Sequence, residues 1–385
     1  MIPYGRHDIN QADIDAVVAV LRSDFLTQGP TVPLFEQTVA SYVSAQHAVA
    51  VSSATAALHI ACLSLGLGPG DWLWTSSVTF VASANCALYC GAQVDFVDID
   101  SRTYNMSVER LAEKLAQAEK DGKLPKIVVP VHLCGQSCDM EAIHMLSQQY
   151  GFKIIEDASH AISGKYKNEA IGNCRYSDIT VFSFHPVKII TTGEGGCALT
   201  NQSDLARKMR LLSSHGITRE ENSMNKKPEG PWYYQQIDLG FNYRMTELQA
   251  ALGISQLSRL DTFLLRRDLL AKRYDELLAH LPVCLPSRST TIKSSWHLYI
   301  VRLDQSYIHQ TRLEVFTSMR QAGIGVNVHY IPVYHQPYYE ELGFRKGHCP
   351  TAEDYYASAI SLPLHPGLKD EEQRAVATAL ELALI

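Results

Sequence analysis

The stretch FSFHPVKIITTGEGG, residues 182–196, places one lysine between an apolar, β-rich run and a glycine-rich turn. The run DITVFSF (178–184) predicts a strand, and CALTN (197–201) predicts a second strand after the turn. The glycines of GEGG allow the backbone to pass close to a bulky neighbour. Most lysines reach water with their charged end. Desolvated beside a sheet, Lys188 would have a lowered pKa and would act as a nucleophilic amine toward an aldehyde.

Short apolar runs alternate with helical patterns in the sequence before this lysine. Further strands are predicted at 48–52, 71–76, 93–99, 126–133 and 152–158, and helices at 55–65, 108–120 and 140–150. This alternation predicts an α/β fold with a mainly parallel sheet in a large domain.

The pattern changes after about residue 245. Residues 246–281 form one long amphipathic pattern that predicts one or two helices. The runs 296–303 and 324–332, with a helix near 311–322 between them, indicate a smaller α+β C-terminal domain. We therefore expect a large domain over 1–250 and a small domain over 251–385. The polar segment 219–236 predicts a mobile or interface loop.

Composition excludes several classes of function. The chain has 385 residues and a formal net charge of −6, which favours neither nucleic acid nor an anionic membrane as partner. It has no signal-peptide pattern at its start and no apolar run of roughly 18 residues, so we expect no membrane span. Its nine cysteines show neither a disulfide framework nor zinc-ligand spacing. We expect a cytoplasmic protein with reduced thiols and no metal site.

Polar residues follow two of the predicted strands. In SSATAALH (52–59) a strand ends in serines and a helix begins, and the free N–H groups of a helix N-terminus suit a phosphate. In IIEDASHA (154–161) a strand ends at Asp157, with His160 three positions later, and ligands of open α/β sheets bind beyond the carboxyl ends of strands.

Each feature also has an ordinary explanation when it is taken alone. Ser53 or Thr55 would simply cap the helix, and Asn242 and Arg244 would simply precede a helix capped by Thr246. A phosphate corner, a strand-end carboxylate and then a lysine, in this order, together indicate a pyridoxal 5′-phosphate (PLP) site.

These motifs resemble those of the DegT/DnrJ/EryC1/StrS aminotransferases, which aminate nucleotide-linked keto-sugars with PLP. The resemblance covers nearly the whole chain, through LTQGP, SSATAALH, EDASHA, FSFHPVK, GEGG, GFNYRMTELQAALG and HYIPVY. It implies the aspartate aminotransferase-like fold, PLP fold type I. It also implies a homodimer with shared active sites.

The resemblance assigns roles to individual residues. Lys188 matches the Schiff-base lysine, Asp157 the partner of the pyridine nitrogen, and His160 the contact of the PLP 3-hydroxyl. Phe80 matches the aromatic that stacks on the ring, and Asn242 a residue that reaches the phosphate of the neighbouring subunit. The phosphate cradle matches Ala54, Thr55 and Ser183. Expected substrate contacts are Tyr4, Asp24, Phe25, Leu26, Thr27, Val333, Tyr334, His335 and Gln336.

Within the family, the nearest resemblance is to the transaminases of pseudaminic acid biosynthesis. Their substrates would be L-glutamate and a UDP-linked 4-keto-6-deoxy-N-acetylhexosamine. Ile189 departs from the proline expected after the lysine, which bears on this branch but not on the chemistry. Arg219 and Arg244 are candidates for binding the carboxylate of the amino donor.

Other functions stay open at this point. The acceptor could be another UDP- or dTDP-linked keto-sugar, of the 4-amino-4-deoxy-arabinose or bacillosamine type. A PLP-dependent sugar dehydratase would resemble the same fold but would carry histidine where this chain has Lys188. A non-enzymatic PLP or sugar-nucleotide sensor would lack the lysine or would carry a DNA-binding module.

Overall fold

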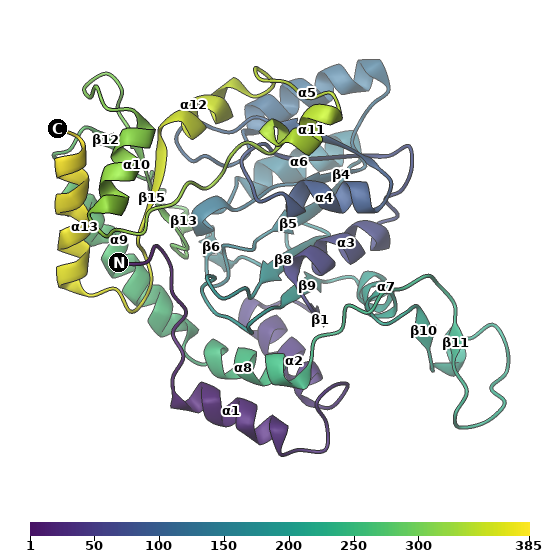
Figure 1. The fold of residues 1–385 in the computed structure, drawn as a ribbon. Coiled ribbons are helices and arrows are strands. Elements are labelled where there is room, and N and C mark those ends of the chain that lie inside the picture. The colour runs from purple at the N-terminus through teal and green to yellow at the C-terminus, as the bar shows by residue number, and fades with distance from the viewer.

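A seven-stranded sheet forms the centre of the computed structural model, which describes residues 1–385 (Figure 1). Its strands are β1 (His47–Val51), β2 (Trp72–Ser76), β3 (Gln93–Val97), β4 (Ile127–Val129), β5 (Lys153–Asp157), β8 (Ile179–Ser183) and β9 (Gly196–Thr200). They lie in the order β1-β9-β8-β5-β4-β2-β3. β9 pairs antiparallel with β1 and with β8, and all other neighbouring strands of the sheet are parallel. The predicted mainly parallel sheet is confirmed, and each strand overlaps a predicted run.

Helices cover both faces of this sheet because alternate side chains of each strand point to opposite faces. On β5, Ile155 packs toward one face and Ile154 toward the other. The helices on the Ile155 face are α3 (Ala54–Ser64), α4 (Ala82–Tyr89) and α7 (Ser203–Ser213). The helices on the other face are α2 (Thr31–Val43), α5 (Val108–Asp121), α6 (Met140–Tyr150) and α8 (Glu247–Leu257). The helices predicted before Lys188 are therefore confirmed.

Helix ends follow capping residues in the sequence. The Ser53 side chain accepts a hydrogen bond from the backbone N–H of Ala56 at the start of α3. At the start of α5 the Ser107 side chain accepts one from the backbone N–H of Arg110. Gly122 ends α5 in the left-handed conformation, with φ of 65°. Thr246 caps α8 in a reciprocal capping box with Gln249.

The N-terminal region contains the helix α1 (Gln11–Leu21), which packs along α8. Asp13 of α1 is fully buried, and its carboxylate accepts hydrogen bonds from the side chains of Ser255, Gln256 and Arg259. These bonds fix the first helix to the end of α8.

The long amphipathic pattern forms two helices, α8 and α9 (Leu260–Leu278), which Ser258 and Arg259 separate. The C-terminal part then forms a small sheet of β12 (Val283–Cys284), β14 (Tyr299–Leu303) and β15 (Ala359–Leu362). Packed around it are α9, α10 (Arg312–Gln321) and α13 (Asp370–Ala383). The run 324–332 makes only isolated bridges, to Ile2 and Ser361.

The N-terminal residues therefore belong spatially to the C-terminal part. Ile2 pairs with Ile324 and packs against the core around β14, and Figure 1 shows both termini on that side of the molecule. The predicted domain boundary at residue 250 stays a prediction.

Short elements complete the chain. They are β6 (Lys165–Tyr166), β7 (Glu169–Ala170), β10 (Ile217–Thr218), β11 (Gln235–Gln236), β13 (Ile292–Lys293), α11 (Pro337–Glu341), α12 (Pro350–Ser358) and the 3₁₀ turns Leu133–Gly135, Glu221–Ser223 and Val333–His335. The predicted loop 219–236 lies in the β10–β11 hairpin, which extends away from the sheet (Figure 1).

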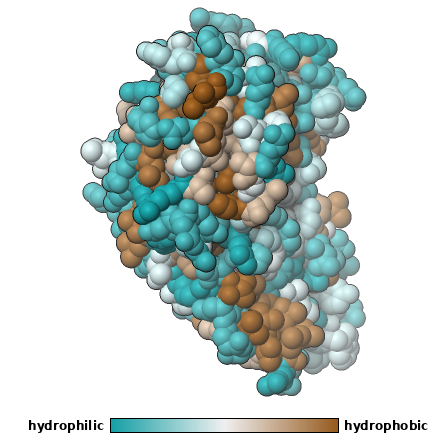
Figure 2. Space-filling model, turned by 60° about the vertical axis from the view of Figure 1, so that its left-hand side comes forward, coloured by the Kyte–Doolittle hydropathy of each residue, from teal (hydrophilic) through white to brown (hydrophobic).

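The surface carries apolar side chains in patches. Figure 2 shows one patch at the lower end of the molecule, the end at which Figure 1 places α1. Exposed apolar side chains of α1, α2 and the turn between them are Ile14, Leu21, Phe25, Leu26 and Leu34. None of the helices is both long and apolar enough to span a membrane.

Candidate active site

Asp157 lies at the carboxyl end of β5 with its side chain buried and held at both oxygens. The hydroxyl of Ser83, on α4, donates to one carboxylate oxygen at 2.6 Å, and the backbone N–H of Ser159 donates to the other at 3.1 Å. The structure therefore fixes the orientation of this carboxyl group at the predicted position.

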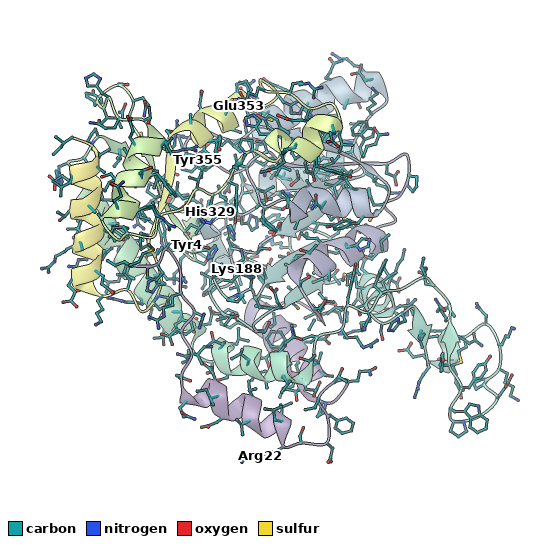
Figure 3. The ribbon with its side chains drawn as sticks, in the orientation of Figure 1. Tyr4, Arg22, Lys188, His329, Glu353 and Tyr355 are labelled. Carbon is teal, nitrogen blue, oxygen red and sulfur yellow. The ribbon has the colours of Figure 1, made fainter.

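Lys188 lies in the loop between β8 and β9, near the carboxyl ends of the parallel strands. Its backbone N–H donates to the carbonyl of His185 at 2.9 Å. Burial lowers the pKa of Lys188 to about 8, although the negative charge of Asp157 opposes this effect. Figure 3 shows Lys188 near the middle of the molecule, with Tyr4 and His329 close by in the same view. An amine with this pKa is partly neutral near neutral pH.

The glycines after Lys188 let β9 pass the start of α3. A Cβ atom on Gly196 would lie 2.5 Å from the backbone nitrogen of Ala54 and 2.5 Å from the backbone oxygen of Ser53. Because backbone cannot give way cheaply, a glycine is required here. The predicted close approach is real, and the neighbour is the helix that carries the phosphate corner.

That corner keeps free backbone donors. Ser53 caps α3 through Ala56, and the first-turn N–H groups of Ala54 and Thr55 have no carbonyl one turn earlier in the helix. Together with the helix dipole they favour an anion. Ser183 is buried at the end of β8, the strand next to β9.

His160 follows the Asp157 turn and is almost fully buried. Its Nε2 lies 3.2 Å from the hydroxyl of Tyr330, and its Nδ1 has no hydrogen-bond partner. Burial, together with the charges of Lys188 and His329, holds the pKa of His160 well below its ordinary value. His160 is therefore a neutral imidazole with one unused nitrogen.

Phe80 precedes α4, and the residue is 59% exposed. The ring centroid lies 6.3 Å from that of Tyr330. An exposed aromatic face beside a partly buried tyrosine is available for stacking on a flat ligand.

These residues fit PLP. The cofactor needs an acid for its ring nitrogen, a donor for its ring oxygen, an aromatic neighbour, an anion corner and an amine. The unpartnered Nδ1 of His160 is the clearest sign of fit, because a buried nitrogen without a partner is costly unless a ligand uses it.

The predicted substrate residues fall into three groups. Tyr4 lies with its ring centroid 5.4 Å from that of His329, and the neighbouring Gly5 runs beside Val187. The segment 24–27 is exposed and pairs with the start of α8 through Thr27 and Thr246. The hydrogen bonds of that segment run to Ser23 and to the start of α8.

The third group lies in and beside the core. Val333 and Tyr334 have no exposed surface and belong to the main core, where the Tyr334 hydroxyl bonds to Glu353. Neither residue is exposed in this structure, and their expected contact with the substrate stays a prediction. For His335 and Gln336, which are partly exposed, it stays a prediction as well.

Asn242 is exposed and pairs with Ser214 through the backbone. Its predicted contact with a neighbouring subunit stays a prediction. Of the two candidate arginines, Arg219 is exposed, and Arg244 donates to the hydroxyl of Ser214 at 3.1 Å.

Three residues of the site received no role from the sequence: His297, His329 and Tyr330. The ring of His297 lies 4.3 Å from that of His160. The Nδ1 of His329 lies 2.7 Å from the Ser361 hydroxyl, and burial and the Lys188 charge lower the pKa of His329 to about 4. His329 and Tyr330 open the motif HYIPVY, and this adjacent polar and aromatic pair was the feature of the sequence that could have indicated a role in the site.

The whole chain is similar to solved aminotransferases. The Helicobacter pylori protein PseC, described as an aminotransferase involved in the biosynthesis of pseudoaminic acid, matches with a TM-score of 0.91 and 30% identity over 100% of this chain and 99% of that chain. The matched structures also include a "Putative sugar aminotransferase Spr1654" of Streptococcus pneumoniae in PLP and PMP forms. The fold and the site thus define a PLP-dependent transaminase of fold type I.

Sequence comparison gives the family. A "Spore coat polysaccharide biosynthesis protein SpsC" of Bacillus subtilis is 39% identical over 96% of this chain and 94% of its own length. A "UDP-4-amino-4,6-dideoxy-N-acetyl-beta-L-altrosamine transaminase" of Campylobacter jejuni is 36% identical over 99% and 96%. The DegT/DnrJ/EryC1/StrS aminotransferase family matches residues 7–381, and the chain belongs to that family.

Proposed function

We propose that this transaminase moves the amino group of L-glutamate to C4 of UDP-2-acetamido-2,6-dideoxy-β-L-arabino-hexos-4-ulose, a step of pseudaminic acid biosynthesis. The motifs around Lys188 and His160 and the likeness to the Campylobacter jejuni transaminase support this acceptor. The observation that carries the chemistry is a lysine with a pKa of about 8 within the field of a fixed carboxylate.

The bound PLP supplies an electron sink for the bond that breaks at the substrate carbon. Asp157 would pair with the ring nitrogen and hold its proton, which keeps that sink effective. The neutral form of Lys188 accepts a proton from the substrate carbon and its ammonium form returns one, and a pKa near the working pH suits both steps.

The acceptor would enter between the sheet and the C-terminal segment. Tyr4 and His329 lie next to each other, and Figure 3 shows both close to Lys188 in its view. Aromatic rings at this place suit the flat face of a sugar and exclude water from the reacting carbon.

Support for a homodimer comes from residues without a partner in their own chain. The α1 region exposes several apolar side chains, and the β10–β11 hairpin exposes Trp232 at 71% and Tyr234 at 51%. A second copy of the chain would cover such surfaces and would place Asn242 at the phosphate of its neighbour.

The first test is the absorption spectrum of the purified protein with PLP. L-glutamate should remove the visible band of lysine-bound PLP, and the proposed UDP-4-keto-sugar should restore it. Borohydride reduction before glutamate is added should leave PLP attached to the peptide that contains Lys188. If the band did not form, or if PLP were attached to another peptide, the proposed role of Lys188 would be wrong.

A second acceptor class is supported by the Bacillus subtilis relative, which bears a polysaccharide biosynthesis name and has the higher identity. A different UDP- or dTDP-linked keto-sugar would then restore the band. Parallel assays with both acceptors at equal concentration decide between them, because only the true acceptor returns the spectrum at a high rate.

A further inference from the structure

His160 has two ring nitrogens in different environments. The Nε2 lies 3.2 Å from the Tyr330 hydroxyl, whereas the Nδ1 is buried and has no hydrogen-bond partner. A neutral imidazole carries its proton on only one of these atoms. Which atom carries it decides whether the free Nδ1 can donate or accept.

Counting donors and acceptors selects one arrangement. If the Tyr330 hydroxyl donates to Nε2, only the Nδ1–H group is left without a partner. If Nε2–H donates to Tyr330 instead, both the Nδ1 lone pair and the tyrosine proton are left without one. Nδ1 is enclosed and the Tyr330 hydroxyl is partly buried. An unsatisfied group costs up to roughly 1–3 kcal/mol when it is buried, so the arrangement that leaves one such group instead of two is favoured.

The electrostatics agree with this choice. Burial raises the pKa of Tyr330 above its ordinary value, so its hydroxyl keeps the proton that it donates. Burial and the charge of Lys188 lower the pKa of His160, which excludes the doubly protonated ring. The proton in the hydrogen bond between Tyr330 and His160 therefore belongs to the Tyr330 hydroxyl, which donates it to Nε2.

We propose that the Tyr330 hydroxyl selects the Nδ1–H tautomer of His160 and so presents a hydrogen-bond donor to the ring oxygen of the bound cofactor. Tyr330 is then a positioning residue that acts through His160. The ring oxygen of PLP is an acceptor when ionised, so the opposite tautomer would place two acceptors together.

The neighbours of His160 hold its ring in place. His297 lies against it with ring centroids 4.3 Å apart, and the Ser295 hydroxyl donates to the His160 carbonyl at 2.8 Å. With both the ring and its backbone held, loss of the Tyr330 hydroxyl changes the proton position more than the ring position. Tyr330 belongs to the C-terminal segment, more than a hundred residues after Lys188, and the tautomer of His160 therefore depends on how that segment packs.

The direct test is nitrogen NMR of protein labelled at the histidine rings, without substrates. The His160 signal, assigned by its loss in His160→Gln, should show Nδ1–H in the wild type and lose that preference in Tyr330→Phe. Tyr338→Phe removes an exposed hydroxyl from the same segment and should leave the signal unchanged. An Nε2–H tautomer in the wild type, or an unchanged signal in Tyr330→Phe, would overturn the proposal.

PLP binding by the substrate-free protein gives a second readout. Tyr330→Phe should weaken PLP binding by roughly tenfold, the size expected for a misplaced hydrogen bond to a charged oxygen. In the His160→Gln background the same change should have no effect, because the glutamine amide donates without Tyr330. An equal loss in both backgrounds would show that Tyr330 acts on the cofactor directly, and the proposal would fail.

Discussion

The charge of a carboxylate at the end of β5 acts on a lysine in the loop after β8 at the centre of the site. Burial lowers the pKa of Lys188 to about 8, and the Asp157 carboxylate raises it against that effect. Ser83 and Ser159 fix the carboxylate, so its charge acts from a constant position. The reactivity of the lysine therefore depends on a residue 31 positions away in the sequence.

Replacing the lysine tests its role directly. Lys188→Ala should lower turnover by about 10⁴-fold or more, because both the amine that holds PLP and the proton carrier are lost. The assay is 2-oxoglutarate release from L-glutamate with a keto-sugar acceptor. Lys293→Ala, at an exposed lysine, serves as the control and should keep its activity.

Asp157→Asn should change a pH profile in a stated direction. The Asp157 charge raises the pKa of Lys188, so removing it should move the midpoint for PLP capture by the apoprotein from about 8 to a lower pH. Turnover should fall by about 10²-fold or more, because the ring nitrogen loses its anion. Borohydride trapping across pH measures the midpoint, and an unchanged or higher midpoint would contradict the assigned coupling.

At the scale of elements, strand β5 carries two carboxylates on opposite faces. Asp157 faces the site, while Glu156 accepts hydrogen bonds from His132 at 2.8 Å, from Thr180 at 3.1 Å and from Ser177. Burial would raise the pKa of Glu156, but these bonds together lower it below its ordinary value. The buried pair fixes β5 to its neighbours and so positions Asp157.

Glu156→Gln should destabilise the protein by about 3 kcal/mol at neutral pH, because an amide cannot accept from all three donors. Since the folded-state pKa of Glu156 is lowered, its stabilisation is present above the unfolded pKa and is lost as the pH falls. The difference between wild type and variant should therefore shrink in acid. Urea unfolding at several pH values measures this difference. Glu113, which forms an exposed ion pair with Arg110, is the control: Glu113→Gln should change the free energy of unfolding by less than about 1 kcal/mol.

The crossing of β9 and α3 gives a second prediction at this scale. Gly196→Ala should cost about 1–3 kcal/mol of stability and weaken PLP binding, because its Cβ would meet backbone atoms of Ser53 and Ala54. Gly68→Ala, where nothing lies within 4 Å of the added Cβ, is the matched control. Thermal unfolding and PLP titration of both variants check this prediction. Equal stability and equal PLP affinity of the two variants would mean that α3 does not depend on this contact.

At the scale of the whole molecule, the site is assembled from distant parts of the chain. The large sheet supplies Asp157, His160 and Lys188, whereas Tyr330 reaches His160 across 170 residues of sequence. The N-terminal residues also join the C-terminal part, so Tyr4 approaches the site together with His329.

Shared active sites can be tested by mixing two inactive variants. If Asn242 serves the neighbouring subunit, Asn242→Ala and Lys188→Ala chains should restore part of the activity when they are unfolded, mixed and refolded together. Each mixed dimer would contain one site with both residues intact. Light scattering should show a dimer, and a monomer or a lack of restored activity would contradict the shared site.

The sequence by itself determined the sheet and the centre of the site. Strand and helix periods are local, and the ends of strands that alternate with helices meet at one edge of a parallel sheet, so Asp157 and Lys188 could be placed together from the sequence. The glycines after Lys188 likewise showed that the backbone passes close to a neighbour, although not which one.

Only the tertiary structure decided which C-terminal residues face the cofactor site. HYIPVY has no regular period, and its side chains point according to how the C-terminal part packs on the sheet. Tyr330 reaches His160, while Val333 and Tyr334 of the same motif are buried in the core. Contacts between segments so far apart depend on the packing of whole elements, and no local pattern of residues contains that information.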